Sequence, residues 1–210
     1  MTQPALEPLS LFATNIFTYD LEPARAETIN REVAALVYRL FDPPPNTMPG
    51  QNLSTHHDLH RRPEMAPLLE AYAEAIERTA AALQVKHRGW AITGCWANVN
   101  RPGIGHVAHY HPNNWLAATY YVQAPSGGNA ITFHDPRQQH YPIYPPVERH
   151  TPSNVSAHPV QVKPGRFCIF PAWLYHSVPA NEGGEDRMSI AINMMLLDAD
   201  EVLPPLIWRG

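Results

Sequence analysis

Three histidines in this sequence have the spacing of a metal site. His109 and His111 are separated by one residue in the run GIGHVAHYHP, so both imidazoles would project from the same face of a β-strand. His176 stands much later, in FPAWLYHSVPAN just after an expected strand. Neutral imidazole is the commonest side-chain ligand for metal ions, and two distant strands can bring such ligands together. The spacing therefore predicts that His109, His111 and His176 bind one divalent ion.

The other histidines near this pattern fit a metal site less well. Those of the polar run STHHDLHRR are expected to be solvated or to cap backbone groups: His56, His57 and His60. His106 precedes His109 by three positions, so strand alternation directs it to the opposite face. His134 could line the same cavity, but the sequence leaves open whether its side chain lies on the same face as the metal ligands.

A single arginine near the end of the chain has the chemistry of an anion-binding group. Arg187 opens the run RMSIAIN. A guanidinium directed into a cavity requires an anion, its planar fork suits a carboxylate, and Ser189 could add a hydroxyl hydrogen bond. The alternative is an ordinary salt bridge. Strand alternation would separate Arg187, Ser189, Ala191 and Asn193 on one face from Met188, Ile190 and Ile192 on the other.

Short strands must position these residues. Six β-rich runs separated by Pro, Gly and Asn follow Arg88: GWAITGCWANVN, WLAATYYVQ, NAITFHD, VSAHPVQV, RFCIFPA and RMSIAINMMLL. No helical pattern interrupts them, which predicts two sheets that enclose a cavity. We therefore expect a mainly β fold with flanking helices, a jelly roll or double-stranded β-helix of the cupin type.

The N-terminal part is expected to support this β-structure. Residues 10–18 read as a short opening strand. Apolar side chains recur at helical intervals from Ala24 to Phe41 and again from Pro63 to Lys86, so each segment can bury one stripe as a helix. The run DPPPNTMPG ends the first helix, and residues 42–62 are expected to form a loop.

The whole chain has the length and composition of one globular domain. Its 210 residues are 44% hydrophobic and only 16% charged, which predicts a single domain over residues 1–210, with residues 1–87 supporting a core of residues 88–200. The net charge of −4 and the scattered basic residues argue against a nucleic-acid partner. Without a membrane-spanning apolar run or a signal sequence, we expect a cytoplasmic protein with reduced cysteines, Cys95 and Cys168. Whether the protein forms a homodimer stays open.

Two patterns around the histidines resemble the paired motifs of the cupin superfamily. The run from Gly103 to His111 gives G-x5-H-x-H, and the run from Gly165 to His176 gives G-x5-P-x4-H. The match is incomplete. The glutamate that cupins place after the second histidine is missing, and Trp173 stands where a glycine is expected.

The stretch from Trp96 to Leu197 also resembles the 2-oxoglutarate and iron dependent oxygenases and, more distantly, the prolyl hydroxylases. The resemblance rests on CWANVN, HYHP, TYYV, SGGNAITFHDPR, PGRFCIFPAWLYHSVPAN and DRMSIAIN. It implies that His109 and His176 bind Fe(II). It also implies that Arg187 holds the distal carboxylate of 2-oxoglutarate, the dianion whose other end chelates the metal.

The same resemblance adds two residues to the cosubstrate pocket and shows one departure. Tyr121 matches a tyrosine that hydrogen-bonds the distal carboxylate, and Asn98, on the preceding strand, would line the pocket. Most of these enzymes have H-x-D or H-x-E, part of a triad of two histidines and one carboxylate, where this sequence has His111. Three neutral imidazoles would leave the metal its full double charge. Asp135, in ITFHDPR, is the alternative third ligand.

The residues and the resemblance together predict a non-heme Fe(II) oxygenase. Such an enzyme would decarboxylate 2-oxoglutarate to succinate and use dioxygen to oxidise a small molecule or a peptide. Two alternatives stay open. A three-histidine, cupin-like dioxygenase would bind its organic substrate directly on the metal, with Arg187 holding a substrate carboxylate. A noncatalytic metal or ligand-binding β-barrel would retain the metal without consuming oxygen.

Overall fold

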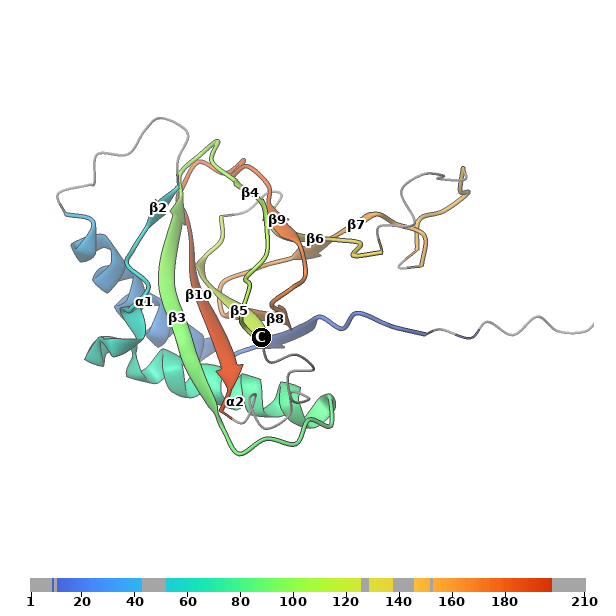
Figure 1. The fold of residues 1–210 in the computed structure, drawn as a ribbon. Coiled ribbons are helices and arrows are strands. Elements are labelled where there is room, and N and C mark those ends of the chain that lie inside the picture. The colour runs from blue at the N-terminus through green and yellow to red at the C-terminus, as the bar shows by residue number, and fades with distance from the viewer. Residues whose placement is uncertain are drawn as a thin grey trace, which may run out of the picture.

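The computed structural model describes residues 9, 11–42, 52–125, 129–137, 146–151 and 153–197. Its strands form two antiparallel sheets (Figure 1). The larger sheet has the order β1 (Phe17–Asp20), β8 (Arg166–Pro171), β5 (Leu116–Gln123), β10 (Arg187–Leu196), β3 (Trp90–Asn100) and β2 (Leu53–Ser54). The smaller sheet has the order β4 (His106–His109), β9 (His176–Val178), β6 (Ala130–His134) and β7 (Ala157–Gln161). All six predicted strand runs are present, each shorter by one to three residues.

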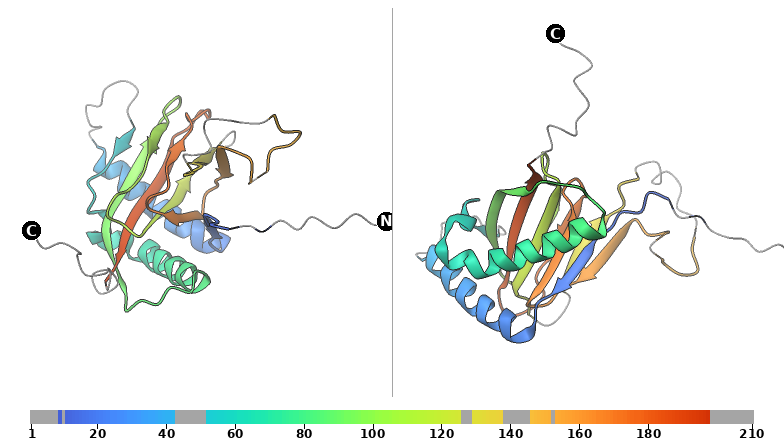
Figure 2. Two further views of the ribbon diagram at one scale, coloured as in Figure 1. Left: turned by 45° about the vertical axis from the view of Figure 1, so that its right-hand side comes forward. Right: turned by 90° about the horizontal axis from the view of Figure 1, so that it is seen from below.

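Two helices cover the face of the larger sheet that is turned away from the smaller one (Figure 2). The first, α1 (Pro23–Leu40), begins with proline at its first turn, where the missing N–H costs nothing. The Glu22 carboxylate accepts hydrogen bonds from the backbone N–H groups of Ala24 (3.1 Å) and Arg25 (2.9 Å). The helix buries the predicted apolar stripe, which includes Ile29, Val33, Leu36 and Val37.

The second helix, α2 (Ala66–Ala82), is shorter than the predicted helix over Pro63–Lys86. Residues Pro63–Met65 form a separate 3-10 turn. Gln84 has a φ of +55°, a left-handed conformation that ends a helix. The buried Tyr72 donates a hydrogen bond from its hydroxyl to the backbone carbonyl of Ile190, which ties α2 to the centre of the larger sheet.

Side-chain alternation gives the larger sheet an apolar outer face and an inner face that carries its buried polar residues. In β10, Met188, Ile190 and Ile192 pack with the helices in the main hydrophobic cluster. Arg187 and Ser189 face the smaller sheet, as the alternation predicts. A second hydrophobic cluster lies on this inner side, and its aromatic members are Tyr121, Phe133 and Phe170.

The N-terminal strand begins later than predicted. Residues 11–16 form no regular strand, and residue 10 lies outside the described residues. The prediction of a strand over residues 10–18 is therefore wrong for most of its length. The strand β1 pairs with β8, and the Asp20 carboxylate lies 2.6 Å from Arg166 Nε and 2.9 Å from Lys163 Nζ. The hydrogen bond from Arg166 is the main reason that the pKa of Asp20 falls to about 2.

The predicted loop over residues 42–62 contains short regular elements. Residues 43–51 of this loop lie outside the described residues. The strand β2 pairs with β3, and Leu59–Arg61 forms a 3-10 turn. Across the described parts of the chain, no helix combines the length and the apolar character needed to span a membrane.

Candidate metal centre

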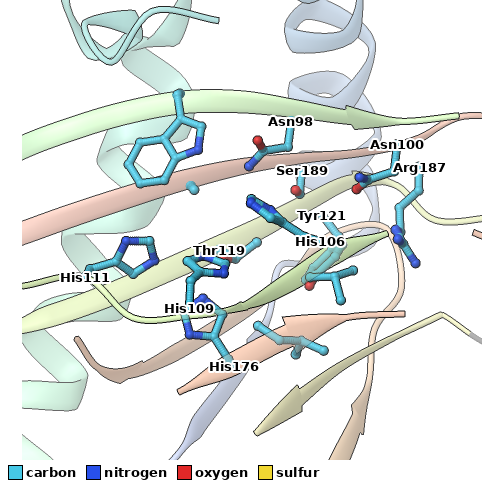
Figure 3. Close-up of a pocket in the computed structure, with 14 residues that line it drawn as sticks. Asn98, Asn100, His106, His109, His111, Thr119, Tyr121, His176, Arg187 and Ser189 are labelled. Carbon is cyan, nitrogen blue, oxygen red and sulfur yellow. The ribbon is translucent and has the colours of Figure 1, made fainter. Parts of the chain in front are cut away.

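A polar pocket lies between the two sheets (Figure 3). Its floor is the inner face of β3, β10 and β5, where the strand register sets side chains in rows: Asn98 is paired with Ser189, which is paired with Tyr121, and Asn100 is paired with Arg187. The opposite wall comes from the smaller sheet and the residues next to it, with His106, His109, His111, Ile131, His176 and Val178. No carboxylate side chain is among the described residues that line this pocket.

The three histidines of the predicted metal site meet in this pocket. His109, His111 and His176 together form the metal cluster, a group of side chains that could bind one ion. Each offers a ring nitrogen that lies within 4.8 Å of those of the other two. The ring centroids are 4.3 Å apart for His109 and His176, and 5.1 Å apart for His111 and either neighbour. His109 and His176 are direct cross-strand partners of β4 and β9, which explains how residues so distant in sequence converge.

Backbone carbonyls fix the orientation of two of these rings. The Nδ1 atom of His109 lies 2.8 Å from the Val107 carbonyl oxygen, and that of His176 lies 3.0 Å from the Leu174 carbonyl oxygen. A carbonyl can only accept, so Nδ1 carries the proton in both rings and Nε2 is left with its lone pair. Such hydrogen bonds are the usual outer partners of metal-binding histidines, because they hold the ring and its tautomer.

Burial keeps two of the three imidazoles neutral at physiological pH. It lowers the pKa of His176 to about 3 and that of His111 to about 4, and the neighbouring histidines add to both shifts. A metal ion binds the deprotonated nitrogen only. The cluster is therefore ready to accept a cation without first losing a proton from these two side chains.

His111 reaches the cluster in a different way from the one predicted. The strand β4 ends at His109, so His111 does not belong to the same strand face as His109. Its backbone N–H donates to the Ala172 carbonyl oxygen over 2.8 Å, which fixes the segment after β4 against the turn that precedes β9. The prediction of two ligands on one strand is wrong, although the predicted pair does lie in one cluster.

His106 also lies in the pocket, whereas strand alternation predicts that it points away. The pairing of β4 with β9 shifts register between His106 and His109, and the shift brings both side chains to the same side. Their rings stack with centroids 4.4 Å apart. Gly105 is the signal in the sequence: a Cβ there would lie 2.6 Å from the Val178 carbonyl oxygen, and a glycine at such a place often marks a close approach or a bulge.

His57, from the polar loop, lies against the site although it is exposed. Its ring stacks on Trp96, with centroids 4.4 Å apart and planes inclined by 16°. Trp96 in turn contacts His111 edge-on at 5.7 Å. The expectation of a merely solvated histidine therefore misses its contact with Trp96, a residue that lines the pocket.

The alternative ligand Asp135 lies elsewhere. Its carboxylate is 2.8 Å from Arg137 Nη2, and it lines a second pocket beside the N-terminal segment. His134 lines that second pocket too, with its Nε2 atom 2.9 Å from the Ser177 hydroxyl. Among the described residues, the group that can hold a metal contains the three histidines and not Asp135.

Arg187 is a buried cation with no carboxylate partner among the described residues. Its side chain is 1% exposed, and burial lowers its pKa. One short hydrogen bond joins Nη2 to the Pro179 carbonyl oxygen at 2.7 Å, the contacts to Asn129 and Ile104 are 3.5 Å long, and Nε has no partner. A buried charge without a counter-ion is costly, so this side chain is suited to bind an anion rather than to form a salt bridge.

The neighbouring polar groups could bind the same anion. Tyr121 is buried, and its burial raises the pKa of the phenol, so the hydroxyl keeps its proton and can donate. Asn98 accepts hydrogen bonds at Oδ1 from the Ser54 hydroxyl (2.5 Å) and from the Asn52 amide (3.1 Å). Because its oxygen is occupied in this way, the Asn98 amide turns its NH2 group toward the pocket (Figure 3).

Comparison with known proteins gives a family match and a set of similar structures. Residues 94–193 match the family model described as "Putative 2OG-Fe(II) oxygenase". A Pseudomonas putida prolyl-4-hydroxylase is similar with a TM-score of 0.60 and 14% identity, over 87% of this chain and 93% of that chain. An oxidoreductase of the 2OG-Fe(II) oxygenase family from Burkholderia pseudomallei has a TM-score of 0.56 and 14% identity, over 85% and 84%.

A third similar structure was solved with its ligands. The epimerase SnoN, in complex with Fe3+, alpha ketoglutarate and nogalamycin RO, has a TM-score of 0.63 and 15% identity, over 94% of this chain and 88% of that chain. A search of curated proteins gave no sequence match. The structural likenesses confirm the double-stranded β-helix fold, and the family match confirms the resemblance seen in the sequence.

Proposed function

Because residues 94–193 match the model of the 2OG-Fe(II) oxygenase family, we propose that His109, His111 and His176 bind Fe(II) and that Arg187 binds the distal carboxylate of 2-oxoglutarate. The enzyme would oxidise a small molecule or a peptide with dioxygen and convert 2-oxoglutarate to succinate and carbon dioxide. One observation carries this proposal: a buried arginine without a carboxylate partner lines the same pocket as a cluster of three imidazoles.

The donor set fits a divalent first-row metal. Imidazole nitrogen suits iron as well as zinc, copper and nickel, and the carbonyl bonds of His109 and His176 leave Nε2 free in each ring. When bound, Fe(II) supplies the activation of dioxygen, which no side chain of the pocket can provide. The protein contributes the placement of the ligands and the exclusion of water from a pocket between two sheets.

The missing carboxylate ligand changes the charge of the site. Three neutral imidazoles leave the metal with a charge of two, where a triad with a carboxylate would leave one. A dianion such as 2-oxoglutarate is therefore attracted by the metal at one end and by Arg187 at the other. Ser189, Tyr121 and Asn98 offer neutral donors beside Arg187 and would complete the binding of the cosubstrate.

The remaining predictions concern location and partners. Dioxygen and an organic substrate follow from the family. A cytoplasmic location, the lack of a nucleic-acid or membrane partner, and the homodimer that the sequence leaves open stay predictions.

An anaerobic titration with Fe(II), with and without 2-oxoglutarate, tests the proposal. We expect a visible charge-transfer band only when both are present, and formation of succinate, measured by mass spectrometry, once oxygen is admitted. Arg187→Ala should weaken the band at a given 2-oxoglutarate concentration. A band that is unchanged in this variant would remove Arg187 from the site. No band and no succinate with the wild type would favour the dioxygenase that binds its substrate directly on the metal.

A further inference from the structure

The pocket contains a fourth histidine for which the proposed function has no role. His106 is half-buried and lines the pocket together with the metal cluster and Arg187. Neither of its ring nitrogens has a hydrogen-bond partner among the described residues. A half-buried ring with two unused hydrogen-bonding atoms inside a ligand pocket is a candidate to bind the ligand, because a polar group of the ligand can replace the water at those atoms.

The backbone is built so that this ring enters the pocket. A regular strand would turn His106 away from the face that carries His109, but the register shift between the two residues brings both to the same side. Gly105 allows the shift, since its backbone approaches the Val178 carbonyl more closely than a side chain would permit. An irregularity that redirects a side chain beside a site is a recognised use of a β-bulge.

The stacking of His106 on His109 argues against a fourth metal ligand. The two ring planes are inclined by only 26°, with centroids 4.4 Å apart. Ligands of one ion turn ring edges, not faces, toward a common point. In agreement with this geometry, His106 is not in the group of described residues that can hold a metal.

The direction of the side chain suggests what it binds. His106 extends from β4 across the pocket toward the strands that carry Asn98 and Ser189, and it lies between the metal cluster and Arg187 (Figure 3). A molecule that reaches from the metal cluster to Arg187 must therefore pass its ring.

We propose that His106 binds 2-oxoglutarate, with a ring N–H donating to an oxygen of one of its two carboxylates. The inference rests on the proposed function and adds to it a residue from the smaller sheet, whereas Arg187, Ser189, Tyr121 and Asn98 all come from the larger one. The dianion would then be bound from both sheets at once.

Two substitutions separate the hydrogen bond from the stacking. His106→Phe keeps an aromatic ring on His109 and removes both nitrogens, while His106→Gln removes the ring and keeps a donor. His158→Phe is the matched control, because His158 is an exposed histidine of the same sheet outside this pocket. Each protein is loaded with Mn(II) without oxygen, and the affinities for Mn(II) and then for 2-oxoglutarate are measured by titration calorimetry.

We expect His106→Phe to bind Mn(II) like the wild type and 2-oxoglutarate roughly 10- to 100-fold more weakly, as for the loss of a hydrogen bond to a charged group. His106→Gln should recover most of the affinity. The proposal is overturned if His106→Phe keeps the wild-type affinity for 2-oxoglutarate, if it loses Mn(II), or if His106→Gln is as weak as His106→Phe. A wild type that binds Mn(II) but no 2-oxoglutarate would overturn the proposed function as well.

Discussion

At the scale of single residues, the pocket joins neutral bases to a permanent cation. His111 and His176 resist protonation because they are buried, while Arg187 keeps its charge without a carboxylate partner among the described residues. A cluster of bases that stays neutral attracts a metal ion, and the lone cation attracts an anion. Binding of a metal ion would give the imidazole lone pairs a partner, and binding of an anion would give the Arg187 charge a partner.

The depressed histidine pKa values predict that the metal-free protein loses stability in mild acid. The unfolded chain takes up protons on these histidines near their ordinary pKa of 6.5, whereas the folded protein does so only near pH 4 for His111 and pH 3 for His176. Stability should therefore fall as the pH decreases from about 6.5 to about 4 for His111 and to about 3 for His176, by up to about 2 kcal/mol for each histidine at pH 5. Urea unfolding at pH 7.5 and pH 5.0 measures the loss.

A variant shows whether this loss comes from the pocket. His176→Gln carries no titrating group at this position, so it should lose less stability than the wild type between the two pH values. Equal losses in the two proteins would show that the acid sensitivity has another origin.

At the scale of elements, the short strand β2 controls a residue of the pocket. Ser54 is exposed, yet its hydroxyl donates a hydrogen bond to the Asn98 amide oxygen. This bond directs the NH2 group of the Asn98 amide toward the pocket. We expect Ser54→Ala to weaken 2-oxoglutarate binding to the Mn(II) protein by roughly 3- to 10-fold and to change the free energy of unfolding by less than about 0.5 kcal/mol.

Ser54→Thr keeps the hydroxyl and should bind 2-oxoglutarate like the wild type. Ser156→Ala, at another exposed serine that does not line the pocket, serves as the control. If Ser54→Ala and Ser156→Ala bind 2-oxoglutarate equally well, β2 has no part in positioning Asn98.

The strand β1 should depend on Asp20 in a pH-dependent way. Its carboxylate pairs with Arg166 and Lys163 of the β8 region, and its pKa falls from 3.8 to about 2. The pairing stabilises the fold above pH 3.8 and is lost as the pH falls toward 2. Asp20→Asn should therefore lower the free energy of unfolding by about 1 kcal/mol at pH 7, as measured by urea denaturation, and by less at pH 3. A difference that is constant across this range would contradict the prediction.

The sequence predicts the elements better than their irregularities. Alternation and helical periodicity depend on burial, so they identify the strand of Arg187 and both helices. The side-chain direction of His106 and the position of His111 depend instead on a register shift and on a backbone hydrogen bond to Ala172. These features involve a partner strand, so the pattern of one segment cannot reveal them. The role of Ser54 is hidden for the same reason, since it is seen only once β2 is paired with β3.

At the scale of the whole molecule, the two sheets have unequal support. Among the described residues, the larger sheet packs against α1 and α2 through the main hydrophobic cluster, and the smaller sheet packs through the second, smaller cluster. The metal cluster joins the ends of β4 and β9 in the smaller sheet. A bound ion would therefore stabilise the less supported part. The arrangement of residues 1–87 and 88–200 as one domain stays a prediction.

Removal of the metal should loosen the smaller sheet selectively. Chelation is expected to increase amide hydrogen exchange in β4 and β9 much more than in β3 and β10, and to lower the free energy of unfolding by about 3 kcal/mol relative to protein in 100-fold excess of metal over its dissociation constant. Hydrogen exchange with mass spectrometry reports both regions in one sample. A uniform increase over the two sheets would mean that the ion acts on global unfolding alone.

On the proposed function, the guanidinium of Arg187 would contact a carboxylate and no other part of the molecule that carries it. Succinate, left after loss of carbon dioxide, keeps the carboxylate that this side chain would bind, so succinate would compete with 2-oxoglutarate for Arg187. Turnover would then follow the ratio of the two diacids around the enzyme, and a rise in succinate would slow the reaction even where 2-oxoglutarate is plentiful.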